Sequence, residues 1–570
     1  MHKISLFNKH KILILSFRFI LAVTIVLLVS LSLDIYKPMW AITAALFLQL
    51  RPEAGFVIEK AVCLIVATLI GLVVGCLIVI FLTGHILLTI LALAVFLTIC
   101  SLISAGINHS NFIYGVALGN ITAILIVLYS IVDPQHITEV QIFHIAYARF
   151  IEISIGAVSA CVASFLVFPC TVENTCSTHS DTIFDATIKH LTTLTDTTSK
   201  KFCVNIATKE ILDSVIAVHN DSTAHIYEKL NSRNNYIIFS NKALNTLKLI
   251  KDYGRNDDFS KNFIQSANTL NTLLKTIDKN KNPKESIQAL RASLNADTSL
   301  VIRNITIAVI KLLLAYSNLK NSKKSIINLK PYRIKNYYNP AIILTATIRN
   351  ISIFLITTTM WTYYPKNIGL LLAIIIMTLI SQLFAGVPRS IILVKNIIVG
   401  FLISVPFAIL IKLAILAFAS NNFSLLLLLF CGGLIIGVVG LTIPKLQMYG
   451  LGYCLGFVFI IQPDNHMSFD IVQSLSVCGG LIMGGVIFYI VFRLLPNAPN
   501  ILTQKLAIMS LYKDLKKVGK TIRSRKEFAA LVAKKLLCVY KYEIYDNPKS
   551  QANIKKAHRL LEIANRHLKG

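Results

Sequence analysis

The sequence predicts an all-α polytopic membrane protein with about twelve transmembrane helices in two parallel six-helix repeats, a cytoplasmic helical insert and a C-terminal helical tail. Three observations predict this fold class. The 570-residue chain is 55% hydrophobic and only 15% charged, with a mean hydropathy of +0.67, which lies outside the range of soluble globular domains. Apolar runs near the roughly 20 residues that cross a bilayer recur along the chain. Similar loop sequences also occur in its two apolar regions.

The apolar runs form two groups that flank a long polar region. They span residues 12–33, 39–50, 61–82, 86–105, 112–132 and 143–168 in the first group, and 341–360, 368–385, 391–417, 423–443, 447–462 and 471–495 in the second. We expect the first run to be a retained span, because it is too long for a signal peptide and no small-residue cleavage site follows it. The predicted domains are a first membrane unit (1–169), a cytoplasmic helical insert (170–338), a second membrane unit (339–496) and a basic cytoplasmic tail (497–570).

The basic residues of the short loops predict the orientation, because Lys and Arg concentrate on the cytoplasmic side. With the N-terminus inside, the same side receives Arg51, Lys60, Arg389, Lys395, Lys445 and Arg493. The opposite side receives Asp34, Asp133, Glu139, Asp464 and Asp470, with Lys37 and Lys366 as exceptions. We therefore expect a multi-pass protein with both termini in the cytoplasm.

The net charge of +29 lies mostly in the soluble segments, residues 171–340 and 501–570. The chain contains no aromatic-interleaved basic motif and no recognised nucleic-acid fold signature. Attraction to the anionic inner leaflet of the lipid bilayer explains the charge more simply. We therefore expect no nucleic-acid partner.

The eleven cysteines lie mostly within apolar runs, and none forms a CxxC pair with metal-like spacing. We interpret them as small buried apolar side chains. The sequence also shows no nucleotide-binding motif and no pattern of nucleophile, base and orienting residue. We therefore expect no metal, no cofactor and no enzymatic activity.

The two membrane units resemble each other at corresponding positions. Arg18 opens the first span and Arg349 the seventh, and "DIYKPMW" follows the former as "WTYYPKN" follows the latter. "VDPQH" precedes the sixth span as "QPDNH" precedes the twelfth. Because each unit has six spans, both begin and end on the same side, so the repeats are parallel. Their interface is the natural place for a permeation path.

The second apolar run, residues 39–50, is too short to cross a bilayer, since twelve residues rise only about 18 Å. Pro52 favours a helix start, so we expect a broken or re-entrant helix whose backbone lines protein or water. Basic residues follow this break at Arg51 and Lys60, and the second unit has counterparts at Arg389 and Lys395. Two interpretations stay open: these residues collect an anionic substrate, or they only anchor the topology.

Two features of the longer spans carry further predictions. Gly71 and Gly75 form a GxxxG pattern, which lets helices approach closely and indicates packing. Arg149 and Glu152 lie three residues apart on one face of the sixth span, where ionisable groups are costly and face a cavity or each other. A structural ion pair is one interpretation. The other makes Arg149 a carboxylate site, because its planar fork offers two parallel donors, and Glu152 its counter-ion or a proton acceptor.

The soluble segments are expected to be helical. Apolar side chains of the segment 263–277 recur at helical spacing. The tail contains basic amphipathic patterns, for which three roles stay open: packing on the insert, lying on the membrane surface, or dimerisation.

This layout, together with "KPMWAITAALFLQLRPEAGFVIEKAVCLIVATLIGLVVG" after the first span and "ARFIEISIGAVSACVASFLVFP" in the sixth, resembles the fusaric acid resistance (FUSC) or aromatic acid exporter family. The matching positions are Trp40, Thr43, Arg51, Pro52, Lys60, Thr68, Gly71, Gly75, Arg149, Glu152, Gly156 and Pro169. The resemblance covers the first 170 residues best, and the second unit mainly by layout.

The resemblance implies an exporter of aromatic or other organic acids in the bacterial inner membrane, in some members paired with a periplasmic adaptor protein. We predict efflux of organic anions driven by the proton gradient, and we expect a homo-oligomer. The predicted substrate-binding residues are Arg51, Arg149, Arg389, Lys60 and Lys395, with Glu152 in proton coupling. The alternatives are a passive organic-anion channel and a non-transporting scaffold whose insert and tail recruit partners.

Overall fold

A computed structural model of the protein is all-helical in the part of the chain that it describes, with no strand there. The described residues are 2–51, 53–82, 84–107, 109–132, 138–167, 171–195, 201–222, 224, 227–228, 233–253, 283–292, 300–320, 334–365, 367–388, 390–418, 422–465, 467, 469–519, 521–522, 524–544 and 547–568.

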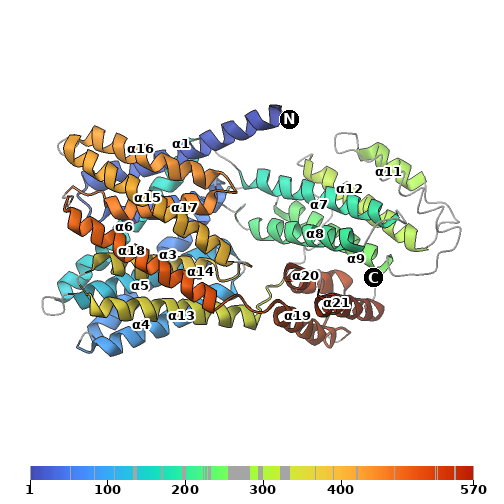
Figure 1. Cartoon of the computed structure of the whole chain (residues 1–570). Helices are drawn as coiled ribbons and strands as arrows, with labels where there is room; N and C mark the ends of the chain where they lie inside the picture. The colour runs from blue at the N-terminus through green and yellow to red at the C-terminus, as the bar shows by residue number, and fades with distance from the viewer. Residues whose placement is uncertain are drawn as a thin grey trace. The chain divides into compact units, whose positions relative to one another are not determined.

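The chain divides into two compact units (Figure 1). The first, called the membrane unit here, contains Met1–Cys170 and Pro340–Ala498, and the second, the insert–tail unit, contains Thr171–Asn339 and Pro499–Gly570. Each unit is therefore assembled from two segments that are distant in sequence. The four-domain division of the sequence stays a prediction.

The membrane unit contains two successive sets of helices. The first set is α1 (His2–Ser32), α2 (Pro38–Leu48), α3 (Ala54–Leu82), α4 (Ile86–Gly106), α5 (Ser110–Val132) and α6 (Glu139–Leu166). The second set is α13 (Pro340–Tyr363), α14 (Ile368–Leu383), α15 (Ser390–Phe418), α16 (Phe423–Thr442), α17 (Gln447–Ile461) and α18 (Ile471–Leu494). Among the described residues, nine helices are long and apolar enough to cross a membrane, whereas α2, α14 and α17 are shorter. The protein is thus a multi-pass membrane protein, and the count of twelve spans stays a prediction.

The three short helices lie inside the unit. Every residue of α2 is buried, and so are nearly all residues of α14 and α17. A helix that is apolar all round is stable only when neighbours cover it. The longer helices provide that cover and expose large apolar side chains, such as Leu69, Val73 and Phe81 on α3. Such side chains match the lipid phase on the outside of the unit.

Close helix pairs organise each half of the unit. In the first half α3 packs along α5 and α2 along α6, and in the second half α15 packs along α17 and α14 along α18. Gly71 lies against the backbone of Gly119, and Gly75 lies against Ala123, so both approach α5. This contact confirms the packing role predicted for the GxxxG pattern.

The two halves also contact each other reciprocally. α1 contacts α16 while α13 contacts α4, and α2 contacts α17 while α14 contacts α5. The buried helices α2, α5, α14 and α17 therefore meet where the two halves join.

The chain is interrupted after α2, where the sequence predicts a break. α2 ends at Leu48 and α3 begins at Ala54; Pro52, to which the prediction assigned the break, lies outside the described residues. The Gln49 side chain, at the start of this break, bonds to α6 inside the protein: its Nε2 donates to the Ala160 carbonyl at 2.9 Å and to Ser164 Oγ at 3.2 Å. Contacts of this kind satisfy polar groups where lipid would not.

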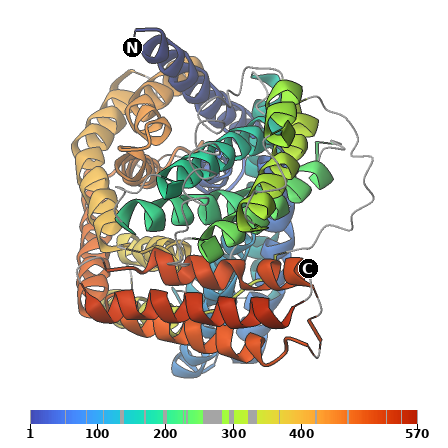
Figure 2. The same cartoon turned by 90° about the vertical axis from the view of Figure 1, so that its right-hand side faces the viewer.

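The insert–tail unit is a helical assembly. Its helices are α7 (Val172–Thr195), α8 (Lys201–Asp221), α9 (Arg233–Tyr253), α11 (Pro283–Ala292), α12 (Leu300–Lys320), α19 (Asn500–Leu515), α20 (Arg525–Lys541) and α21 (Pro548–His567). The three tail helices pack on one another (Figure 2). α20 also contacts α8 and α9, so the tail packs on the insert, which was one of its three predicted roles. The predicted helix over 263–277 lies outside the described residues.

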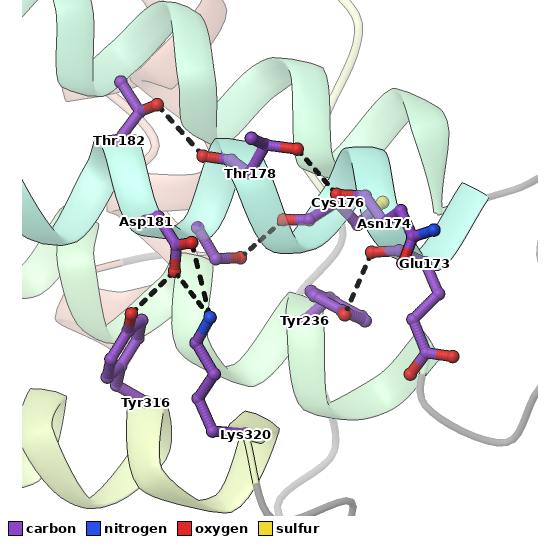
Figure 3. A network of polar contacts seen from close by, with 10 residues as sticks. Glu173, Asn174, Cys176, Thr178, Asp181, Thr182, Tyr236, Tyr316 and Lys320 are labelled. Atoms are coloured by element: carbon purple, nitrogen blue, oxygen red, sulfur yellow. Dashed lines mark hydrogen bonds and ion pairs between the residues drawn. The ribbon is translucent and has the colours of Figure 1, made fainter. Parts of the chain in front are cut away.

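Polar contacts tie α7 to α9 and α12 in this unit (Figure 3). The Tyr316 hydroxyl donates to Asp181 at 2.6 Å, and Lys320 pairs with the same carboxylate at 3.2 Å. Tyr236 donates to the Glu173 carbonyl at 3.3 Å. Burial and the adjacent Asp181 raise the pKa of Tyr316, which keeps its hydroxyl a donor. Because Lys320 is half exposed, its ion pair adds little stability, and we interpret the network as structural.

Candidate functional site

Arg149 and Glu152 form a buried ion pair inside the membrane unit. Both lie on α6, which begins at a Thr138–Gln141 capping box. Arg149 is 2% exposed and Glu152 is fully buried, and a distance of 2.7 Å separates Arg149 Nη1 from Glu152 Oε2. Within the described part of the chain this is the one hydrogen bond that the guanidinium donates. The pair is therefore monodentate.

The second carboxylate oxygen of Glu152 is held by the start of α2. The backbone N–H of Lys37 donates to Glu152 Oε1 at 3.0 Å. The Lys37 ammonium donates to the Tyr129 hydroxyl at 2.9 Å and lies 4.3 Å from the centre of that ring. Sequence reasoning treated Lys37 only as an exception to the topology rule, because nothing in the sequence places it beside Glu152.

Aromatic rings surround the Arg149 guanidinium. Its Cζ lies 4.8 Å from the Trp40 ring centre and 5.9 Å from that of Tyr129, so cation–π attraction holds it in place. An arginine offers five N–H donors in a planar fork. With one of them given to Glu152, the others are the groups that could accept a ligand carboxylate.

The guanidinium lines an apolar cleft where the two halves meet, called the Arg149 cleft here. Its walls come from α2, α5, α6, α14 and α17, and include Trp40, Thr43, Ile376 and Phe459. Arg149 is the charged residue among those that line it. The Trp40 and Phe459 rings meet edge to face at 5.1 Å, which joins the two halves across the cleft. Its volume of about 20 Å³ holds about one water molecule.

Lys60 and Arg51 lie at the other end of α2. Lys60 is buried, and its Nζ donates to the Phe47 carbonyl at 3.4 Å while lying 5.4 Å from the Tyr114 ring centre. A cation that caps the last carbonyls of a helix stabilises that end. The Arg51 guanidinium stacks 4.1 Å from the Phe56 ring centre. The contacts of Lys60 therefore describe a helix cap more directly than a ligand site.

A carboxylate that sequence reasoning left unassigned lies next to Lys60 in the chain. Glu59 is buried and accepts a hydrogen bond of 2.5 Å from Asn111 Nδ2. His109 Nε2 lies 3.9 Å from the same oxygen. The charges "RPEAGFVIEK" and the polar residues that open α5 are visible in the sequence, but their meeting depends on the packing of α3 against α5.

Among the described residues predicted to bind substrate, Arg149 and Lys60 do not share a site. Arg149 and Lys60 lie near opposite ends of α2, whose 11 residues rise about 16 Å. Lys395 is exposed on α15, and Arg389 lies outside the described residues. Within the described ranges no three His, Cys, Asp or Glu side chains gather as a metal site.

The fold and the site define a class of protein, a helical multi-pass membrane protein with a charged pair at the junction of its two halves. Residues 12–568 match the Fusaric acid resistance protein family. The chain belongs to that family, as its resemblance predicted.

Two relatives share the name p-hydroxybenzoic acid efflux pump subunit AaeB. The protein of Erwinia billingiae (strain Eb661) is 22% identical over 527 residues, which cover 85% of this chain and 76% of that protein. The protein of Musicola paradisiaca (strain Ech703) is 28% identical over 121 residues, which cover 21% of this chain and 18% of that protein.

Proposed function

We propose that this protein exports organic anions, in particular aromatic carboxylates, across the bacterial inner membrane by using the proton gradient. The observation that carries the proposal is the Arg149 cleft, an apolar space with one guanidinium at the junction of the two halves. An aromatic carboxylate has matching chemistry: one anionic group and one apolar ring. The names of the two relatives support the same class of substrate.

The proposed binding mode uses both parts of the cleft. The substrate carboxylate accepts hydrogen bonds from the nitrogens of Arg149 that do not bind Glu152, and its ring stacks with Trp40 and Phe459. Because the cleft holds only about 20 Å³ in this conformation, a substrate of this size requires the surrounding helices to move apart.

A duplicated architecture provides such a movement. We propose two parallel six-helix repeats, one in each half of the membrane unit, with twelve spans in total. The reciprocal contacts of α1 with α16 and of α13 with α4 support this arrangement. So do Arg18 and Arg349, both 1% exposed, which donate to the Ser164 carbonyl and to Asn497 Oδ1 near the ends of their own halves. Rocking of one repeat against the other then exposes the Arg149 cleft to each side in turn.

Glu152 is the proposed proton acceptor. In its charged form it neutralises Arg149, and protonation weakens this interaction and frees the guanidinium for substrate. Three other charged groups influence this carboxylate: Arg149 at 2.7 Å, Lys37 through its backbone N–H at 3.0 Å and its ammonium, and Asp464 by its charge.

The remaining features of the proposal concern orientation and partners. We propose that both termini are cytoplasmic and that Arg51, Arg389 and Lys395 collect the anion at that side. The word subunit in the names of the relatives supports a multi-component pump. We propose that a periplasmic adaptor protein and further copies of this chain are its other components. We further propose that the protein is not an enzyme.

The test is uptake of radiolabelled 4-hydroxybenzoate into inside-out membrane vesicles, with and without a protonophore. Accumulation above the outside concentration that collapses with the protonophore is the expected result. Equilibrating flux that ignores the protonophore would instead identify a passive channel. Flux equal to that of vesicles without the protein, for 4-hydroxybenzoate and related acids, would contradict transport of this class and favour the scaffold.

A further inference from the structure

A second cavity of the membrane unit, about 120 Å³ in volume, lies at the Lys37 end of α2. Both halves contribute to it: Lys37 precedes α2, Lys412 lies near the end of α15, and Gln462 and Asp464 follow α17. We call it the Lys37–Lys412 cavity. It has room for several water molecules, in contrast to the Arg149 cleft, and its walls combine charged and polar side chains with apolar ones.

Two ammonium groups of residues that line this cavity have N–H donors with no hydrogen-bond acceptor among the described residues. Lys412 is half-buried, and its Nζ contacts the Ile460 carbonyl at 3.5 Å, the limit for a hydrogen bond. The Lys37 ammonium donates to the Tyr129 hydroxyl. Each ammonium carries three N–H donors, and within the described residues neither forms an ion pair with a carboxylate. Two cations that face one cavity from opposite halves would attract an anion.

Two carboxylates lie near these ammonium groups: Asp464 in the wall of the cavity, and Asp470, whose charge acts on Lys412. Asp464 lines the same cavity and accepts the backbone N–H of Asn465 at 2.7 Å. Asp470 caps α18 by accepting the Val472 N–H at 2.8 Å. Since Asp464 is the one acidic residue among the lining residues, against two lysines, the charge that lines the cavity is positive.

The wall of the cavity is held in an unusual backbone conformation. Gln462, which ends α17, has a φ of +51°, a left-handed conformation that is uncommon for a residue other than glycine. The loop that follows is fastened to α1, because Asn465 Nδ2 donates to the Leu31 carbonyl at 2.9 Å and to Asp34 Oδ1 at 2.7 Å. Strained residues of this kind cluster at ligand sites.

The cavity also adjoins the Arg149 cleft. Met39 lines the cavity and the next residue, Trp40, lines the cleft. On the other half Ile460 lines the cavity and the preceding Phe459 lines the cleft. The two spaces therefore follow one another along α2 and α17.

We propose that Lys37 and Lys412 form a second binding site for the carboxylate, which receives the anion from Arg149 on its way out. This inference rests on the proposed function, since the second site binds the same class of substrate. One lysine from each half contacts the carboxylate, so the site is complete only while the two halves are close together at this end.

The test is equilibrium binding of radiolabelled 4-hydroxybenzoate to the full-length protein in nanodiscs. Wild type is expected to bind one more anion per chain than Lys412→Met or Lys37→Met, and Lys412→Arg is expected to restore the lost site. The matched control is Lys445→Met, which removes the same charge from an exposed residue between α16 and α17 and should bind like wild type. Arg149→Met is expected to lose the other site and to keep this one.

The outcomes separate the two proposals. Two results would overturn the second site and leave the Arg149 site intact. One is wild-type stoichiometry in both lysine variants. The other is a wild type that binds only one anion per chain, when Arg149→Met binds none. A wild type that binds no 4-hydroxybenzoate or related acid would overturn the proposed substrate class together with this inference.

Discussion

The backbone N–H of Lys37 donates a hydrogen bond of 3.0 Å to Glu152 Oε1. This bond fastens the start of α2 to the buried Arg149–Glu152 pair on α6. Since Lys37 lines the Lys37–Lys412 cavity and Arg149 lines the Arg149 cleft, a change in the charge of Glu152 is expected to act on both spaces. Glu152 is therefore the residue through which protonation and anion binding are expected to influence each other.

Glu152→Gln is expected to flatten the pH dependence of 4-hydroxybenzoate exchange. In wild type a charged Glu152 holds Arg149 at high pH, so exchange should rise as pH falls and Glu152 takes up a proton. Glutamine keeps an acceptor for Arg149 but carries no charge at any pH, so its exchange should stay near the low-pH rate. The measurement is counterflow in proteoliposomes with equal pH on both sides. An unchanged pH profile would remove Glu152 from proton coupling.

Gly452→Ala is expected to destabilise the membrane unit. A Cβ at this position of α17 would overlap the Ile397 carbonyl oxygen of α15, and such overpacking costs about 1–3 kcal/mol. Gly432→Ala on α16 is the matched control, because nothing lies within 4 Å of its added Cβ. Thermal unfolding in detergent should show a lower midpoint for Gly452→Ala alone. Equal midpoints would contradict the close packing of α15 on α17.

Lys60→Met is expected to lower stability more than it changes substrate affinity. The buried Lys60 ammonium donates to the Phe47 carbonyl at the end of α2, and loss of a hydrogen bond from a charged group costs about 1.5–3 kcal/mol. The readouts are the unfolding midpoint and the half-saturating concentration of 4-hydroxybenzoate in vesicles. A weaker half-saturation with unchanged stability would instead support the substrate-binding role predicted from the sequence.

Lys534→Met is expected to remove a pH dependence from the insert–tail unit. Burial lowers the pKa of Lys534 to about 8, and its partners are the neutral amides of Asn336 and Asn220, at 2.6 and 3.3 Å. The unfolded state has the ordinary lysine pKa of about 10.4, so it binds more protons between these values. The stability contributed by this site therefore rises with pH over that window.

The measurement is the resistance of α20 to proteolysis at each pH. It is expressed as the ratio of the wild-type value to the value of Lys534→Met. The ratio should increase from about pH 7 to about pH 10, and the variant should be the more resistant chain at the lower pH. A ratio that does not change with pH would contradict the buried environment of Lys534.

Sequence periodicity and apolar runs predict most of the membrane unit, since every apolar run corresponds to a described helix. Run length also predicts the interruption after α2. The sequence does not reveal that α14 is as thoroughly buried as α2, because an apolar helix is equally apolar whether lipid or protein surrounds it. That distinction depends on tertiary packing.

The candidate site could be predicted only in part. Arg149 and Glu152 are recognisable because ionisable residues inside an apolar span are rare. Trp40 and Phe459 meet across the junction of the halves, and no periodicity links residues so distant in sequence. Lys37 and Lys412 likewise become partners only through the shared cavity.

The most direct test of the account is uptake of 4-hydroxybenzoate by vesicles that contain the double variant Arg149→Met/Glu152→Leu. Replacing a buried ion pair with apolar residues is often neutral or stabilising, whereas removal of one partner costs about 3–5 kcal/mol. The double variant should therefore fold and reach the membrane. If Arg149 binds the substrate, uptake should fall about tenfold or more, as expected for the loss of a charged hydrogen bond. Uptake equal to that of wild type at equal protein level would show that the pair is only structural and would contradict the central claim.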